Sequence, residues 1–339
     1  MRILEVSRYK NNFADHQLPF VTEQGEAIAQ ELRKLDNGHL TLDNGASAVE
    51  YFLVKGNYVT AVRELKKKIR EFKPDIVHAH YGLSAITAEL QGLVPVVTTF
   101  HNGETLNWSV NLMSSLMSLR AKHVIYVAQH IRDLSYFKAK NYSIIPCGVP
   151  MEEMVITPKE EARQRLGGDP EKKYILFGGA FDNTRKNYAL LKQAVERLKI
   201  EDCRLKIECI EMKGLSRAEC VLRMCAADLF ALPSHSEGSP QALKEAMACN
   251  CPCIATDIAD VRELFGDEPG HWILRNPRKT HERWDADEKS LDEMVELLKD
   301  ALMFEGRTKG RERILELGLS NEQVARRVVR IYEGIVEKV

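Results

Sequence analysis

The sequence predicts an α/β protein built from two doubly wound domains, each with a parallel sheet between two layers of helices. Short apolar runs such as Leu229 to Leu232 alternate with longer amphipathic segments along the chain. Uniformly apolar strands are typical of parallel sheets, which are buried on both faces. The chain has 339 residues, which is long for one hydrophobic core and comfortable for two. Glycine and proline between 148 and 171 separate two such alternating sets.

Residues 1–150 contain the first set of alternating segments. We expect six strands there, beginning near Arg2, Tyr51, Asp75, Val94, His123 and Ser143. Helical patterns lie between them, most clearly over 58–72. The polar stretch 37–50 receives no assignment.

Residues 151–320 contain the second set. We expect five strands, beginning near Tyr174, Leu205, Leu229, Cys253 and Trp272. Capping-box patterns at Ser216 and Ser290 predict two helix starts, and Ser320 with Gln323 predicts a third. That last helix spans about 321–339 and carries an apolar stripe, so it must pack on one of the two domains.

The overall composition excludes several classes of protein. The formal net charge is −1, which gives no sign of nucleic-acid binding. No apolar run approaches the eighteen or so residues of a membrane-spanning helix, and Met1 to Val6 is too short and too soon charged for a signal peptide. A cytoplasmic protein is therefore expected. Cys249, Cys251 and Cys253 alternate along a strand entry, which is not the spacing of a zinc site.

The densest signal lies between Ala227 and Asp257, which reads as strand, loop, helix and strand. Ser239 is expected to cap a helix whose first residue is Pro240 and which runs to about Cys249. The start of such a helix favours a phosphate group. Glu237 lies in the loop and Glu245 lies one helical turn beyond Gln241. Carboxylates repel phosphate but accept hydrogen bonds from hydroxyl groups, so this pattern predicts a nucleotide sugar. The alternative is a pair of solvated charges.

This stretch resembles a known family of enzymes. Glu237-Gly238, six further residues and Glu245-Ala-Met-Ala form a Glu-x7-Glu pattern similar to the donor-site signature of retaining glycosyltransferases of family 4, which have the GT-B fold. The resemblance implies two Rossmann-like domains facing across a cleft. It implies that 1–150 bind the acceptor, that 151–320 bind the donor, and that the last helix crosses back onto the first domain. Glu237 would then bind donor-sugar hydroxyls, Glu245 the ribose, and Ser239 and Pro240 would form the helix start beneath the diphosphate.

Two cations are candidates for binding the diphosphate. Arg185 and Lys186 follow the expected strand that ends at Phe177 and precede the helix from Asn187. Lys186 matches the family lysine, whereas Arg185 is displaced, because Ala180 and Asn187 stand where relatives carry an arginine and a second glycine. The alternative for this pair is an ordinary exposed surface.

His101 is a candidate catalytic residue together with Glu237. It follows an expected strand and resembles the family histidine near the reaction centre, whereas His78 and His80 are expected to be structural. The loop Asn11 to His16 lacks the glycines with which relatives approach the phosphates, which leaves its role open.

The resemblance implies a retaining transferase of the hexosyltransferase type that moves a sugar from a UDP- or GDP-sugar to a glycan or lipid-linked acceptor in surface polysaccharide synthesis. No Asp-x-Asp motif is present to hold a metal, so none is expected. The alternatives are a nucleotide-sugar 2-epimerase and a non-catalytic sugar-nucleotide binding protein. The basic amphipathic helix 58–72 also suggests a peripheral contact with the inner face of a membrane, the alternative being a solvated face.

Overall fold

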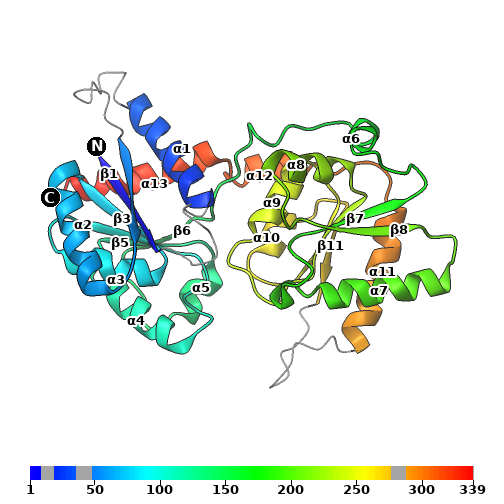
Figure 1. Cartoon of the computed structure of the whole chain (residues 1–339), viewed down its shortest axis with the longest axis horizontal. Coiled ribbons are helices and arrows are strands. Elements are labelled where there is room, and N and C mark those ends of the chain that lie inside the picture. Colours follow the sequence, from blue (N-terminus) through cyan, green and yellow to red (C-terminus); the bar gives the residue numbers. More distant parts are fainter. Residues whose placement is uncertain (9–18, 36–47, 276–287, 339) are drawn as a thin grey trace. The chain divides into compact units, whose positions relative to one another are not determined.

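The computed structural model describes residues 1–8, 19–35, 48–275 and 288–338. They divide into two compact units, the first comprising Met1–Gly148 with Leu319–Val339 and the second Val149–Gly318. Each unit is a parallel sheet covered by helices, which confirms the predicted fold class (Figure 1). The loop 11–16 lies outside the described residues. None of the described helices is long and apolar enough to cross a bilayer.

The first unit is a six-stranded sheet in the order β2-β1-β3-β4-β5-β6. Its strands are β1 (Ile3–Arg8), β2 (Val49–Val54), β3 (Ile76–His80), β4 (Val96–Phe100), β5 (His123–Tyr126) and β6 (Tyr142–Ile144). Its helices are α1 (Pro19–Leu35), α2 (Tyr58–Phe72), α3 (Gly82–Gln91), α4 (Trp108–Ser118), α5 (Gln129–Leu134) and α13 (Asn321–Val336).

Helices α1 and α13 cover one face of this sheet, and α2 and α3 cover the other (Figure 1). The capping box of Ser320 and Gln323 that begins α13 is present, as predicted. Val324 and Val328 then bury their side chains beside Ile3 of β1. A segment from the far end of the sequence therefore completes the core of the first unit.

The second unit is a five-stranded sheet in the order β11-β10-β9-β7-β8. Its strands are β7 (Lys173–Phe177), β8 (Ile207–Glu211), β9 (Leu229–Leu232), β10 (Cys253–Thr256) and β11 (His271–Leu274). Its helices are α6 (Lys159–Arg165), the 3-10 turn η2 (Thr184–Lys186), α7 (Tyr188–Glu201), α8 (Arg217–Ala226), α9 (Gln241–Ala248), α10 (Val261–Phe265), α11 (Glu288–Met303) and α12 (Gly310–Glu316).

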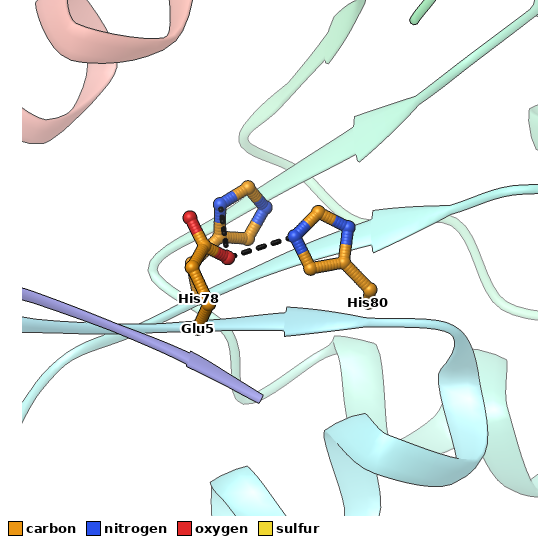
Figure 2. Close-up of side chains that lie close together, drawn as sticks. All are labelled: Glu5, His78 and His80. Carbon is orange, nitrogen blue, oxygen red and sulfur yellow. Dashed lines mark hydrogen bonds and ion pairs between the residues drawn. The ribbon is translucent and has the colours of Figure 1, made fainter. Parts of the chain in front are cut away.

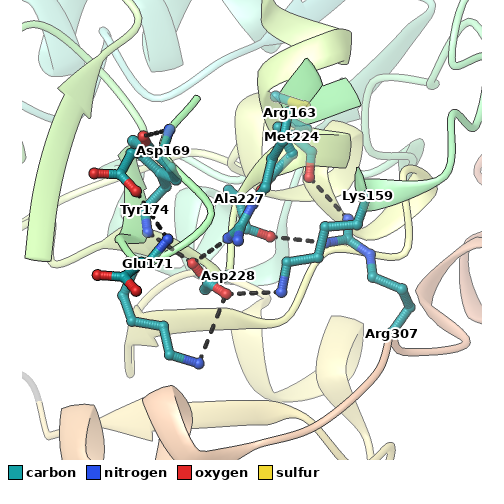
Figure 3. A network of polar contacts seen from close by, with 11 residues as sticks. Lys159, Arg163, Asp169, Glu171, Tyr174, Met224, Ala227, Asp228 and Arg307 are labelled. Carbon is teal, nitrogen blue, oxygen red and sulfur yellow. Dashed lines mark hydrogen bonds and ion pairs between the residues drawn. The ribbon is translucent and has the colours of Figure 1, made fainter. Parts of the chain in front are cut away.

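Asp228, whose carboxylate is buried, links the amino ends of β7 and β9 (Figure 3). It accepts hydrogen bonds from Lys159 Nζ at 2.7 Å, from the backbone N–H of Tyr174 at 2.7 Å and from Arg163. Burial alone would raise the pKa of Asp228, but Lys159 and the Tyr174 N–H outweigh it and hold the pKa below its usual range. Helix α6 is thereby tied to β7 and β9.

Two local expectations are wrong. Ser290 does not cap a helix, because α11 already includes Glu288 and Ser290 is buried within it. The apolar stripe of α2 is not free for a membrane, because Leu65 and Ile69 pack into the core of the first unit. The exposed side of α2 is charged, and Lys68 forms an ion pair with Glu50.

Candidate functional site

The candidate donor site lies where the order of strands in the second sheet reverses. The chain runs from β7 outward to β8 and then returns to β9 on the opposite side of β7. In open α/β sheets, ligands bind at the carboxyl ends of the strands beside such a switch point. The loops that leave these ends carry Arg185 and Lys186 after β7 and Glu237 after β9.

The structure brings these three predicted residues together. Lys186 Nζ lies 2.7 Å from Glu237 Oε1, and Arg185 Nη1 lies 3.3 Å from Glu237 Oε2. Arg185 also donates to the carbonyl of Ser236 at 2.6 Å and accepts the backbone N–H of His235 at 3.0 Å. The two loops are thus joined by both side-chain and backbone bonds.

Glu237 is nearly buried and ionised. Burial alone would raise its pKa, but Lys186 and then Arg185 outweigh burial and hold the pKa below its usual range. A buried carboxylate is stabilised only when such partners are present. The site therefore holds a carboxylate that can accept hydrogen bonds, beside two cations that can meet an anion.

Two backbone positions after β7 accept few other residue types. A side chain at Gly178 would meet the ring of Phe230, because its Cβ would lie 2.6 Å from the ring. Asn187 has φ of 58°, a left-handed conformation that glycine adopts freely and asparagine adopts more readily than most residues. Asn187 stands at the family's second glycine, and its conformation explains how this departure is accommodated.

The start of α9 differs from the prediction by one residue. Pro240 is the residue before the helix rather than its first residue, and Gln241 begins the helix. The hydroxyl of Ser239 does not cap it but donates to Asp260 Oδ2 at 2.6 Å. Gly238 and Ser239 thus lie in the loop that leads to the helix, where the expected anion site falls.

Glu245 has a partner that the sequence did not suggest. It lies on α9, is buried, and is bonded by Arg217, the first residue of α8. The capping box of Ser216 and Glu219 begins α8 as predicted, and it fixes the position of Arg217. A capping pattern shows where a helix begins but not which residue its first side chain contacts.

His101 belongs to a chain of hydrogen bonds in the first unit. Its Nε2 lies 3.1 Å from His80 Nδ1. In turn, His80 Nε2 lies 2.7 Å from Glu5 Oε2 (Figure 2). On its other side, His101 Nδ1 lies 3.6 Å from the sulfur of Cys147. Glu5 and His80 come from β1 and β3, at the switch point of the first sheet. His80 is buried, as expected of a structural residue, and it also contacts His101.

The direction of these hydrogen bonds follows from the groups that form them. Burial lowers the pKa of His80, whereas His78 and His80 lower the pKa of Glu5 to about 2 although burial alone would raise it. A carboxylate can only accept, so His80 in its neutral form donates from Nε2 and accepts at Nδ1 from His101. His101 then presents an N–H at Nε2 to His80.

Glu5, His78 and His80 also place three metal-ligating atoms within 4.8 Å of one another. Within the trio, His80 Nε2 is hydrogen-bonded to Glu5 Oε2 at 2.7 Å, and His78 Nδ1 lies 3.5 Å from the same oxygen. His78 binds the Tyr332 hydroxyl at 2.6 Å and the Thr99 hydroxyl at 2.7 Å, which engages both of its nitrogens. The trio fits a buried hydrogen-bond network better than a metal centre.

A cavity of about 290 Å³ lies toward the amino ends of the strands of the second sheet. Its lining includes Gly168, Lys172 and Tyr174, at or before the first residues of β7. It contains none of the predicted site residues. It lies at the amino ends of the strands, away from the edge where such sheets bind ligands.

Comparison with known proteins agrees with this fold. Residues 27–153 match the profile of Glycosyltransferase Family 4, and residues 208–300 match that of Glycosyl transferases group 1. The chain belongs to family 4 of the glycosyltransferases and has the GT-B fold. The family assignment agrees with the resemblance seen in the sequence.

A curated relative is TuaC of Bacillus subtilis, assigned as a glycosyltransferase of teichuronic acid biosynthesis, which is 28% identical over 228 residues. The match covers 59% of this chain and 57% of TuaC, so it spans little more than half of that relative. Sucrose-phosphate synthase from Thermosynechococcus elongatus has a similar structure, with a TM-score of 0.73, 16% identity and full coverage of both chains. HepE from Anabaena, solved with UDP-glucose, has a TM-score of 0.64 at 15% identity, covering 100% of this chain and 99% of HepE.

Proposed function

We propose that this enzyme transfers a sugar from a UDP- or GDP-sugar to a glycan or lipid-linked acceptor, with retention of configuration, in the synthesis of a surface polysaccharide. The observation that supports this most directly is the meeting of Lys186 and Arg185 with Glu237 at the switch point of the second sheet. The UDP-glucose bound by HepE and the teichuronic acid pathway of TuaC support the donor and product classes.

In this proposal, Lys186 and Arg185 stabilise the departing diphosphate. Negative charge builds on that group as the bond to the sugar breaks, and preset cations lower the barrier because they need not reorganise. The departing phosphate oxygen takes the proton of the acceptor hydroxyl on the same face of the sugar. No step requires a metal ion, since the two side chains supply the positive charge.

Glu237 binds hydroxyl groups of the donor sugar. A carboxylate accepts several hydrogen bonds at once, here from Lys186 and Arg185 among others. Glu245, held by Arg217, accepts the ribose hydroxyls. His101 acts near the reaction centre, where its imidazole bonds to a donor-sugar hydroxyl.

A thermal-shift screen of the full chain with UDP, GDP, ADP and CMP and their common sugars tests the donor site. We expect one base to stabilise the protein selectively, because a ligand that binds only the folded state raises the melting temperature. The absence of a shift with every nucleotide would overturn the donor-site assignment.

The selected donor then separates transfer from the alternatives. Incubation with an acceptor extract should give an acceptor-dependent product with the donor's anomeric configuration. Conversion of donor to an isomer without acceptor would indicate a 2-epimerase, and binding without any turnover would indicate a non-catalytic protein. Either result would contradict the proposed transfer.

A further inference from the structure

The cavity of about 290 Å³ in the second unit lies on one face of its sheet. Alternate side chains of a strand point to opposite faces. Ile175 of β7 and Ile207 of β8 pack into a core with α7 and α11 on one face. Leu176 and Ile210 have the opposite parity, and they line the cavity on the other face. Helices α6 and α8 supply the rest of the wall, so the cavity lies between these helices and the sheet.

Small residues leave this space open. The wall opposite the strands contains Gly167 and Gly168, from the loop after α6, and Ala226 and Ala227, from the end of α8. Protein interiors are normally packed without voids of this size, because the atoms around an empty void lose dispersion contacts. Four small residues around one space therefore indicate room for a ligand.

Arg223 of α8 adds a positive charge to this lining. Its Nε atom is buried and has no hydrogen-bond partner among the described residues. Glu219, one helical turn earlier, attracts it but is already bonded to Ser216 in the capping box. A buried charged donor without an acceptor costs free energy that an incoming acceptor would recover. Arg223 is therefore the group that a ligand's anion would meet.

The other charged groups of the lining are already engaged. Arg163 is bound by Asp228, which lies outside the lining (Figure 3). Lys172 Nζ lies 3.0 Å from a carboxylate oxygen of Glu208. Asp169 accepts the backbone N–H two residues further on at 2.9 Å. Because the two carboxylates of the lining repel an anion, its place is at Arg223 rather than elsewhere in the cavity.

The remaining side chains of the lining favour an apolar body. They are Leu166, Tyr174, Leu176 and Ile210. The ring of Tyr174 is fixed from two sides: the Arg163 guanidinium lies over it, 5.3 Å from its centroid, and the N–H of Asp169 donates to its hydroxyl at 2.7 Å. A largely apolar wall with a few placed polar groups is typical of small-molecule sites. Such sites measure about 300–1,000 Å³, so this cavity admits only a small ligand.

We propose that this cavity binds a small organic anion, a carboxylate or phosphate ester with an apolar or aromatic body, whose charged group bonds to Arg223. Guanidinium groups bind carboxylates and phosphates through paired hydrogen bonds, and the body leaves water for the aliphatic lining. None of the proposed donor-site residues lines the cavity. The inference therefore does not depend on the proposed donor, acceptor or reaction.

Two other kinds of molecule are poorer occupants. A bare inorganic anion would satisfy Arg223 but would leave the aliphatic lining in contact with water. A neutral apolar molecule would cover that lining but would leave the Nε of Arg223 without an acceptor. A ligand that combines a charge with an apolar body meets both requirements of the wall.

Fluorine NMR of the purified full chain tests the site with probes of matched chemistry. 4-Fluorobenzoate and 4-fluorophenyl phosphate carry both a charge and an aromatic body, 4-fluorobenzyl alcohol lacks the charge, and trifluoroacetate lacks the body. We expect the better of the two aromatic anions to bind at least tenfold more tightly than the alcohol and trifluoroacetate. The comparison of the two aromatic anions identifies the charged group that the site prefers.

Two variants remove the site in different ways. Arg223→Met should weaken binding of the preferred aromatic anion at least tenfold, because the charge-assisted hydrogen bonds are lost. Gly168→Leu should have the same effect by occupying the space. A Cβ at Gly168 would lie 3.4 Å from the Arg163 carbonyl and 3.5 Å from the Tyr174 ring, which are ordinary contacts. We therefore expect this variant to fold, and its melting temperature checks that.

Matched controls place the same changes elsewhere. Arg197→Met alters α7, which covers the other face of the sheet, and Gly334→Leu alters α13, where a Cβ would meet nothing within 4 Å. Neither control should change binding of the aromatic anion. Lys186→Met removes a cation of the proposed donor site, and it should also leave this binding unchanged.

Four results would overturn the proposal. The first is that neither aromatic anion binds the unaltered chain. The second is that the alcohol or trifluoroacetate binds as tightly as the preferred aromatic anion. The third is equal binding by either site variant and its matched control. The fourth is loss of binding in Lys186→Met, which would assign the probe to the donor site.

Discussion

The imidazoles of His80 and His101 are joined nitrogen to nitrogen at 3.1 Å, and the far side of His80 is bound by Glu5 at 2.7 Å. A buried carboxylate on β1 thus fixes the tautomer of a histidine two hydrogen bonds away. The role of His101 in transfer can therefore be tested through a residue that does not touch the substrate.

Glu5→Gln keeps an oxygen that can accept from His80 but removes the negative charge. We expect turnover to fall about tenfold, which corresponds to a loss of about 1.4 kcal/mol of transition-state stabilisation. We also expect any limb of the pH–rate profile that reports His101 to move to lower pH, because protonated His101 loses a nearby anion. A profile identical to that of Glu26→Gln would mean that Glu5 is only structural.

Lys186→Met should weaken donor binding about 10- to 100-fold, because charge-assisted hydrogen bonds contribute roughly 1.5–3 kcal/mol. Loss of Lys186 also leaves Glu237 with less compensation, so Lys186→Met with Glu237→Gln serves as the variant in which folding is protected. Titration calorimetry with the selected nucleotide diphosphate gives the affinities. The exposed Lys192→Met is the matched control, and equal affinities for the two single variants would contradict the diphosphate role.

Glu245→Gln should reduce the affinity for a ribonucleotide but leave that for its 2′,3′-dideoxy analogue nearly unchanged. The reason is that the proposed bonds go to the ribose hydroxyls, which the analogue lacks. Arg217→Met should have a similar but smaller effect, since Arg217 acts by holding Glu245. Unchanged ribonucleotide affinity in Glu245→Gln would remove Glu245 from the site.

Asp228→Asn should lower the free energy of unfolding by about 3–5 kcal/mol, because it leaves Lys159 and Arg163 without their buried counter-charge. Donor affinity should stay unchanged below the melting transition, because Asp228 lies at the amino ends of the strands and the donor site at the carboxyl ends. Chemical denaturation measures the first effect and calorimetry the second. A large loss of donor affinity in the folded variant would show that the two ends of the strands are energetically coupled.

His271 should contribute to acid sensitivity. Its ring stacks on Phe265 with centroids 4.6 Å apart, and burial lowers its pKa to about 4. His271 therefore takes up a proton near pH 6.5 in the unfolded chain but only near pH 4 in the folded chain. Its contribution to the free energy of unfolding is complete above pH 6.5 and is lost as the pH drops toward 4. The loss amounts to about 3 kcal/mol. His271→Phe should show a flatter fall of unfolding free energy over this window, and an unchanged slope would assign the sensitivity to other groups.

Much of the fold follows from local sequence patterns. The apolar runs mark the strands because both faces of each parallel sheet are covered, as at Leu229 to Leu232, which is buried throughout. Capping boxes at Ser216 and Ser320 fixed two helix starts. The pattern failed at Ser290, where the same letters occur inside a helix, because a capping box depends on the backbone conformation before the helix as well as on residue type.

The grouping of the candidate residues could be predicted where they are close in sequence. It could not be predicted where they are far apart. Glu237 and Glu245 stand in one short motif, but the hydroxyl of Ser239 turned to Asp260, 21 residues away. The bond between His80 and His101 depends on β3 and β4 being neighbours, and the bond to Glu5 depends on β1 lying on the other side of β3. Strand order is a property of the whole chain, which local patterns do not contain.

The first unit has a consequence for biosynthesis. Its core requires Val324, Val328 and Tyr332 of α13, which a ribosome translates only after the whole of the second unit. Domains usually fold as the chain emerges, the amino-terminal one first. Here we expect the order to be reversed: the second unit can close while the first still exposes an open apolar face along β1, β3 and α1. Nascent chains that stall before residue 321 should therefore recruit chaperones through their earliest segment.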